Sequence, residues 1–101
     1  MVSIPVSQFD DNSVVTVQIE GQEVVVFKIE EDYFALNNRC SHAEASLSEG
    51  EVYDCKAECP LHGAEFDLKT GEPLTLPATK PVKVYDVLLQ NDLLIIQDKH
   101  A

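Results

Sequence analysis

Two short motifs constrain this chain more than any other feature of its sequence. They are Cys40-Ser41-His42 and Cys59-Pro60-Leu61-His62-Gly63, with sixteen residues between the histidine of the first and the cysteine of the second. Thiolate and imidazole groups bind soft and borderline metals, and a short Cys/His pair lets one tight loop present both ligands. The whole chain has only three cysteines and three histidines. The sequence therefore predicts a metal site whose ligands are Cys40, His42, Cys59 and His62.

The same four ligands are compatible with two kinds of metal centre. They can close a tetrahedron around one zinc ion. Zinc sites usually contain a run of cysteine pairs or an H-x3-5-H pair, and this sequence has neither. A mixed Cys-x-His and Cys-x-x-His set is more typical of a 2Fe–2S cluster, with two thiolates on one iron and two imidazoles on the other.

At this point the sequence resembles a known family, the Rieske proteins. The residues that carry the likeness are Cys40-Ser41-His42, Leu47-Ser48-Glu49-Gly50, Cys59-Pro60-Leu61-His62-Gly63, Phe66-Asp67 and Thr70-Gly71. The likeness is closest to the small soluble Rieske ferredoxins that serve ring-hydroxylating oxygenases. It implies an all-β Rieske fold, in which antiparallel strands form a sandwich-like base and a small cluster-binding subdomain spans about 38–71. We expect one domain, 1–101.

The resemblance also assigns roles to the four ligands. Cys40 and Cys59 are expected to hold the iron that stays ferric, because their negative charge stabilises the higher oxidation state. His42 and His62 are expected to hold the second iron, where the incoming electron localises. The expected cofactor is one Rieske-type 2Fe–2S cluster per chain.

Short apolar or partly alternating runs are separated by turn residues, a pattern typical of antiparallel strands. The expected strands are 2–6 (an edge strand, because it contains a proline), 14–19, 23–29, 33–36, 64–68, 82–89 and 93–97. Residues 51–58 are expected to form a hairpin arm between the two ligand loops. No window of twelve residues shows helical periodicity, so we expect little helix.

Several other residues with reactive side chains are given plainer roles. Cys55 and Cys59 form a C-x3-C pair that could make Cys55 a ligand in place of Cys40, but only Cys59 carries the Pro-Leu-His-Gly continuation. Cys55 is therefore expected to be a small buried residue of a strand. His100 is expected to lie in a solvated tail. Glu44 and Glu49 are expected to lie in a solvated loop, because nothing pairs them with a nucleophile.

Four positions depart from the pattern of respiratory-chain Rieske proteins. Those relatives brace their ligand loops with a disulfide, but the equivalent positions here are Ala45 and Leu61. They also place a serine and a tyrosine, whose hydroxyls bond to sulfur, where this chain has Ala64 and Phe66. The proline-bearing stretch 76–81 corresponds either to the family's cluster-shielding loop or to a plain connection.

The chain is strongly acidic, with 18 acidic residues against 7 basic ones and a formal net charge of −11. Such a surface repels nucleic acid and anionic membranes, so neither is an expected partner. The charge serves solubility, or it steers the chain toward basic docking patches on a partner protein. The first ten residues lack a basic, apolar signal pattern, and no apolar run approaches a membrane span, so we expect a cytoplasmic protein.

Taken together, these features predict a monomeric one-electron carrier rather than an enzyme. It is expected to pass electrons from a flavin- or NAD(P)H-dependent reductase to a terminal ring-hydroxylating oxygenase. One alternative is a Rieske-like accessory protein for redox sensing or iron–sulfur cluster assembly. Another is a zinc-stabilised binding module.

Overall fold

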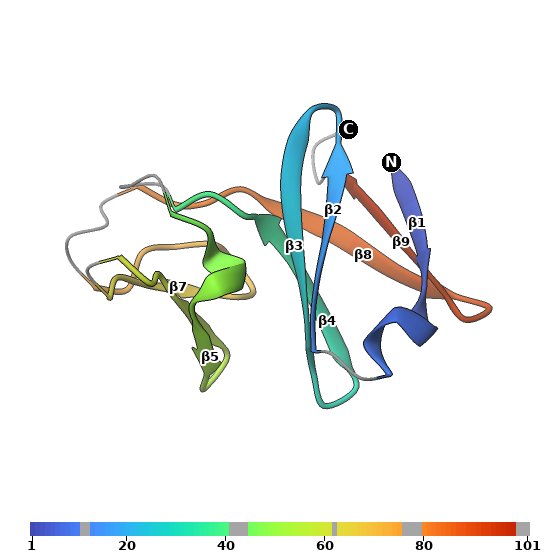
Figure 1. Cartoon of the computed structure of the whole chain (residues 1–101), viewed down its shortest axis with the longest axis horizontal. Helices are drawn as coiled ribbons and strands as arrows, with labels where there is room; N and C mark the ends of the chain where they lie inside the picture. The colour runs from blue at the N-terminus through green and yellow to red at the C-terminus, as the bar shows by residue number, and fades with distance from the viewer. Residues whose placement is uncertain (11–12, 41–44, 62, 76–79, 99–101) are drawn as a thin grey trace.

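The computed structural model describes residues 1–10, 13–40, 45–61, 63–75 and 80–98. Nine strands form two antiparallel sheets in these ranges, which confirms the expected all-β class. The six-stranded base sheet has the order β1-β9-β8-β4-β3-β2, and a three-stranded sheet, β5-β6-β7, lies at one end of it (Figure 1). The strand bounds are β1 Val2–Pro5, β2 Val14–Ile19, β3 Gln22–Ile29, β4 Asp32–Asn37, β5 Glu51–Tyr53, β6 Lys56–Glu58, β7 Glu65–Asp67, β8 Val84–Gln90 and β9 Leu93–Asp98.

Helix is minor in the described part of the chain, as expected. It consists of two short 3-10 helices, η1 Val6–Phe9 and η2 Leu47–Glu49. None of the described helices is long and apolar enough to cross a membrane.

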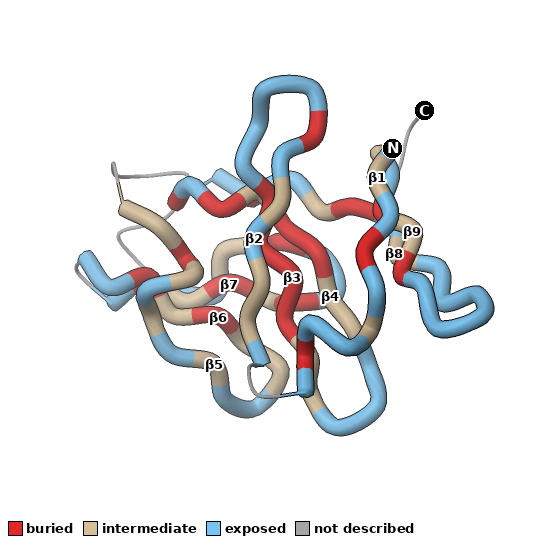
Figure 2. Tube along the Cα trace, turned by 45° about the vertical axis from the view of Figure 1, so that its right-hand side comes forward, coloured by how far each residue is buried: buried red, intermediate tan, exposed pale blue. Residues whose placement is uncertain are grey.

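Strand β3 is buried on both faces, which explains its unbroken apolar run. Val24 and Val26 face a base core shared with β1, β4, β8 and β9, whereas Val25 and Phe27 face a second core shared with the small sheet. All four are at most 1% exposed, and Figure 2 shows most of β3 coloured as buried near the middle of the molecule. A strand covered on two sides gains apolar burial from every residue rather than from alternate ones. The small sheet is thus attached to the base through a continuous apolar interface.

Tight turns fix the register of the hairpins. Ile19 pairs with Gln22 and Tyr53 pairs with Lys56, so each of these hairpins turns through two residues. Both turn residues have positive φ in each case, at Glu20-Gly21 and at Asp54-Cys55. This backbone shape matches the right-handed twist of the flanking strands.

Candidate metal centre

Cys40 and Cys59 lie together in the interior, although nineteen positions separate them in the sequence. The structure joins their sulfur atoms as a disulfide, with the Cα atoms 6.4 Å apart. Their exposed fractions are 2% and 1%. Because a metal ligand must be a free thiolate, metal binding by this pair would require the reduced form of both cysteines. The fold therefore brings together two of the four predicted ligands.

The first ligand loop begins at Cys40 and ends at Ala45, and the second begins at Cys59 and ends at Ala64. The same kind of backbone hydrogen bond closes both loops. The amide of Cys40 donates to the carbonyl oxygen of Ala45 at 2.9 Å, and the amide of Cys59 donates to that of Ala64 at 2.7 Å. In each loop the bond spans five residues and involves no sulfur atom. The backbone therefore ties the ends of each loop together without help from the sulfur atoms.

The two loops also pack closely on one another. A Cβ atom built on Gly50, just after η2, would lie 1.8 Å from the carbonyl oxygen of Glu58, the residue before Cys59. Gly50 itself has a negative φ, so the requirement for glycine here is steric rather than conformational. The backbone at Gly50, which follows the first cysteine loop and η2, therefore packs directly against the residue that precedes the loop of Cys59.

The other two predicted ligands, His42 and His62, lie outside the described residues, as do Glu44, His100 and the stretch Leu76–Thr79. Their predicted roles stay predictions. Glu49 is described and is exposed at the end of η2, in agreement with a solvated position. Among the described residues, no three histidine, cysteine or acidic side chains gather as a metal site.

The cysteine pair nevertheless fits the thiolate half of a 2Fe–2S group. Both sulfur atoms belong to a buried apolar cluster that includes Leu47, Ala64 and Phe66. Two thiolates from two loops converge at one point, and the surrounding side chains exclude water. Such surroundings keep a metal–thiolate centre from hydrolysis and help to set its reduction potential. The histidine half of the donor set rests on the sequence motif.

The four departures from the respiratory pattern are placed by the structure. Ala64 and Phe66 are fully buried in the same core as the cysteines, and neither side chain carries a hydroxyl group that could donate to a sulfur atom. Ala45 is half-buried and Leu61 is 43% exposed, and neither can form a disulfide.

The prediction that Cys55 is a buried strand residue is wrong. Cys55 occupies the β5–β6 turn with φ of 62° and is only half-buried. The hairpin needs two consecutive left-handed residues here, and they are Asp54 and Cys55. Asp54 is a weak turn signal, but no glycine or asparagine follows it, so the sequence did not identify a two-residue turn here.

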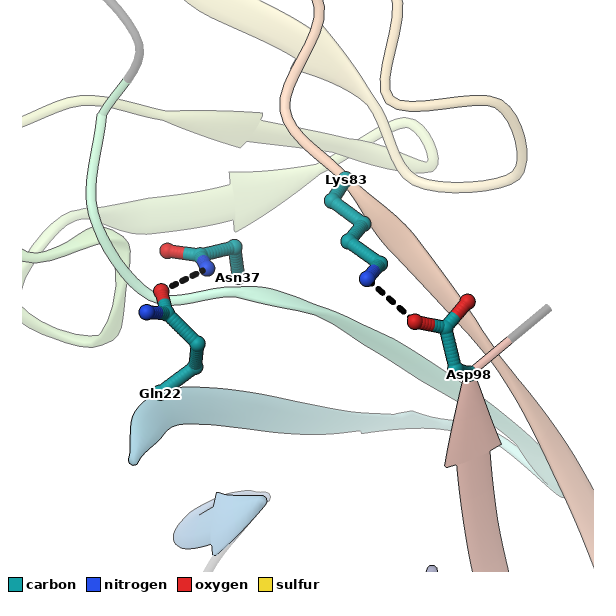
Figure 3. Close-up of polar contacts among 4 residues, drawn as sticks. All are labelled: Gln22, Asn37, Lys83 and Asp98. Atoms are coloured by element: carbon teal, nitrogen blue, oxygen red, sulfur yellow. Dashed lines mark hydrogen bonds and ion pairs between the residues drawn. The ribbon is translucent and has the colours of Figure 1, made fainter. Parts of the chain in front are cut away.

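Lys83 places a positive charge beside the first ligand loop. A surface hollow of about 300 Å³ is lined by Cys40, Arg39 and Lys83, among others. The Lys83 ammonium group donates to the Asp98 carboxylate, and this hydrogen bond raises the pKa of Lys83 (Figure 3). On the same side, the Asn37 amide donates to Gln22 Oε1 at 3.1 Å.

Beside the second ligand loop, the charge is negative. Glu51, Glu58 and Glu65 occupy one row across the small sheet, because they pair in register. The Tyr53 hydroxyl donates to Glu65 and, at 3.4 Å, to Glu58. A Cβ atom at Gly63, where φ is +69°, would lie 3.8 Å from Glu58 Oε2, so this carboxylate borders the loop of Cys59.

Sequence reasoning did not identify what two residues of this centre do. Asn38, directly before the first motif, is the buried polar residue of the described chain, and Gly50 makes the loop–loop contact above. An asparagine at the mouth of a loop is a recognisable signal, because its side chain often bonds to nearby backbone. The close approach at Gly50 could not be read from the sequence, because it joins residues eight positions apart through the fold.

Comparisons with known proteins agree with this arrangement. Residues 1–86 match the family model described as the Rieske [2Fe-2S] domain. A ferredoxin component of naphthalene 1,2-dioxygenase/salicylate 5-hydroxylase systems from Ralstonia sp. is 37% identical over 81 residues, which cover 80% of this chain and 78% of that protein. A 3-phenylpropionate/cinnamic acid dioxygenase ferredoxin subunit from Photorhabdus laumondii is 46% identical over 70 residues, covering 68% of this chain and 67% of that protein.

Solved structures show the same fold. The ferredoxin of carbazole 1,9a-dioxygenase from Nocardioides aromaticivorans superimposes with a TM-score of 0.87 at 34% identity, covering 95% of this chain and 94% of that chain. A chain from the complex of reduced oxygenase and oxidized ferredoxin in carbazole 1,9a-dioxygenase gives a TM-score of 0.85 at 27% identity. That match covers 94% of this chain and 99% of the other.

Proposed function

The chain belongs to the Rieske [2Fe-2S] domain family, and on that premise we propose that it is an electron-carrying ferredoxin of a multicomponent ring-hydroxylating dioxygenase system. It would receive single electrons from a flavin- or NAD(P)H-dependent reductase and pass them to a terminal oxygenase. The names of its relatives support this role, because they are ferredoxin components of dioxygenase systems rather than catalytic components.

The observation that carries the proposal is the meeting of Cys40 and Cys59 in the interior. These two residues would hold one iron of a single 2Fe–2S cluster, and His42 and His62 would hold the other. When bound, the cluster supplies reversible uptake of one electron. The cluster-binding part would span about 38–71 within a single domain, 1–101.

The chain's own residues suit a carrier. The backbone bonds that close the two cysteine loops would hold both thiolates in nearly the same place before and after electron transfer. Little rearrangement at the metal favours fast electron exchange. Apolar burial of the cysteines would keep water and competing thiols away from the metal.

The partners follow from the charge and from the relatives. A formal net charge of −11 supports weak docking onto basic patches of the reductase and the oxygenase. We propose that the chain acts as a monomer in the cytoplasm. One of the similar solved structures is a complex of reduced oxygenase and oxidized ferredoxin in carbazole 1,9a-dioxygenase, which supports docking to an oxygenase.

Chemical analysis of the purified chain tests the cofactor. We expect about two irons and two acid-labile sulfides per chain, lost in Cys40→Ser and Cys59→Ser but kept in the matched variant Cys55→Ser. One zinc per chain without sulfide would contradict the proposal. Turnover of a reconstituted reductase and oxygenase should then depend on the loaded chain, whereas turnover that is independent of it would contradict the carrier role.

A further inference from the structure

We propose that Asn38 is a positioning residue that holds the first ligand loop in the shape that binds the metal, with Glu23 as its anchor on the base sheet. The proposal deepens the proposed function, on which it rests, because it concerns retention of the same cluster. Asn38 is 2% exposed and lies between β4 and Cys40, so it touches the loop without being a candidate ligand.

The Asn38 side chain is bonded on both sides. Its Nδ2 group donates to Glu23 Oε1 at 2.6 Å, and its Oδ1 atom accepts from the backbone amide of Ser48 at 2.8 Å. Glu23 belongs to β3, and Ser48 lies in η2 beyond the loop. One amide group therefore connects the base sheet to the far end of the first ligand loop.

The Asn38 backbone repeats the same two connections. Its amide donates to the carbonyl oxygen of Glu23 at 2.9 Å, and its carbonyl oxygen accepts from the Leu47 amide at 2.7 Å. Residue 38 and residues 47–48 are thereby tied together at the two ends of the loop. Inside this closure, Arg39 forms a bridge with Ser46, and Cys40 bonds to Ala45.

Loss of the Asn38 side-chain hydrogen bonds should be costly. A hydrogen bond to a carboxylate is stronger than one between neutral groups, and a buried amide left without partners is costly. Truncation of Asn38 would leave the Ser48 amide and the Glu23 carboxylate without this partner. The loop would then be held mainly by its short backbone contacts. Residues that orient metal ligands typically change metal affinity 10–100-fold when they are altered.

A polarity swap tests the role. Asn38→Asp keeps the shape and the acceptor for Ser48, but it removes the donor and sets two carboxylates against each other. Glu23→Gln alone keeps an acceptor and should change little. In the double variant Asn38→Asp/Glu23→Gln, the glutamine amide can donate to the introduced carboxylate, so the hydrogen bond returns with its direction reversed.

The readout is the rate at which the loaded protein loses iron to an excess of chelator. We expect about tenfold faster loss for Asn38→Asp and substantial recovery in the double variant. The control is Leu94→Ala, a truncation at a fully buried position in the base core, away from the ligand loops. It should lower the melting temperature without a matching increase in iron loss. Equal rates for Asn38→Asp and Leu94→Ala, or no recovery in the double variant, would overturn the proposal.

A second measurement does not need the cluster. In the cluster-free chain, the Ser48 amide should exchange slowly with deuterated solvent, and Asn38→Ala should speed its exchange much more than that of amides in β9. Unchanged exchange at Ser48 would also overturn the proposal. If the wild-type chain binds no iron at all, the proposed function fails, while the exchange experiment still decides whether Asn38 holds the loop.

Discussion

The backbone amide of Cys59 donates a 2.7 Å hydrogen bond to the carbonyl oxygen of Ala64, five residues later. The amide of Cys40 makes the equivalent bond to Ala45 at 2.9 Å. Neither bond uses a sulfur atom, so both bonds can form whatever the sulfur atoms bind. Fixing the two ends of each loop in advance lowers the conformational entropy that would be lost when a metal centre is inserted.

The first prediction concerns the cluster-free chain. Because Cys40 and Cys59 are close enough to pair, air oxidation should leave one titratable thiol per chain, that of Cys55. A strong reductant should raise the count to three. Closing a loop with a sequence separation of 19 should add about 3 kcal/mol to the free energy of unfolding. Three thiols in the oxidised sample would contradict the pairing, and denaturant unfolding with and without reductant checks the stability.

The second prediction concerns the contact between the two ligand loops. Gly50→Ala places a Cβ atom against the backbone oxygen of Glu58, which cannot yield without moving the loop of Cys59. We expect a loss of about 1–3 kcal/mol in unfolding free energy together with faster iron loss. Gly21→Ala is the control, because nothing lies within 4 Å of its Cβ position and its φ is +81°. That variant should lose stability through backbone strain while retaining iron as the wild type does.

The third prediction concerns pH. The hydrogen bond from Tyr53 to Glu65, together with the nearby charge of Glu58, raises the pKa of Tyr53 well above its ordinary value. The protonated phenol is favoured in the fold, so its contribution to stability is complete below about pH 10 and is lost as pH rises through the raised pKa. The tyrosinate absorbance of the wild type minus that of Tyr53→Phe should show the delayed titration. In Glu65→Gln the titration midpoint of Tyr53 should move down toward pH 10. An unchanged midpoint would mean that Glu65 does not cause the raised pKa of Tyr53.

Much of the base sheet could be predicted, because its strands obey local rules. The expected strand at 14–19 coincides with β2, and the run at 23–29 differs from β3 by one residue. Residues 51–58 form a complete hairpin rather than a single arm, because the chain turns at Asp54-Cys55. Both turn residues have a positive φ, which aspartate tolerates but cysteine does not favour, so we infer that packing of the small sheet helps to decide the turn.

The cysteines of the candidate site could be predicted from the sequence, but the residues that hold them in place could not. The motif identifies Cys40 and Cys59, since metal binding restricts both the residue type and the spacing, and the fold brings them together. The importance of Asn38 was not predictable, because its partner Glu23 is fifteen residues away on another strand. Local patterns report which residues can bind a metal, whereas the groups that orient them are set by tertiary contacts.

The fourth prediction concerns the reduction potential. Hydrogen bonds to cluster sulfurs stabilise the added negative charge of the reduced state, and the side chains of Ala64 and Phe66 have no hydroxyl group to donate them. The midpoint should therefore lie at the low end of the Rieske range of roughly −150 to +300 mV. Ala64→Ser and Phe66→Tyr should each raise it in protein-film voltammetry. Ala57→Ser adds a hydroxyl at another fully buried position of the same core, outside the ligand loops, and should leave it unchanged. A wild-type midpoint above about +200 mV would contradict this reasoning.

The fifth prediction is that encounter with the reductase is steered by charge. A net charge of −11 produces a long-range field, and the row containing Glu58 borders the loop of Cys59. The Debye length shrinks from about 30 to about 8 Å as ionic strength rises from about 0.01 to 0.15 M. In stopped-flow measurements, the second-order rate of reduction should therefore fall steeply over that span.

Two charge-neutralising variants separate steering from solubility. Glu58→Gln removes a charge beside the ligand loop, whereas Glu31→Gln removes one at the exposed β3–β4 turn, at the opposite end of that hairpin from Asn37. Both variants have the same net charge, so solubility alone predicts equal behaviour. If the reductase docks near the loop of Cys59, Glu58→Gln should weaken the salt dependence of the reduction rate more than Glu31→Gln does. The reason is that a charge close to the docking surface acts more strongly on the partner than a distant one. A rate that does not respond to salt, or an equal effect of the two variants, would leave the acidic surface near Cys59 without a role in docking.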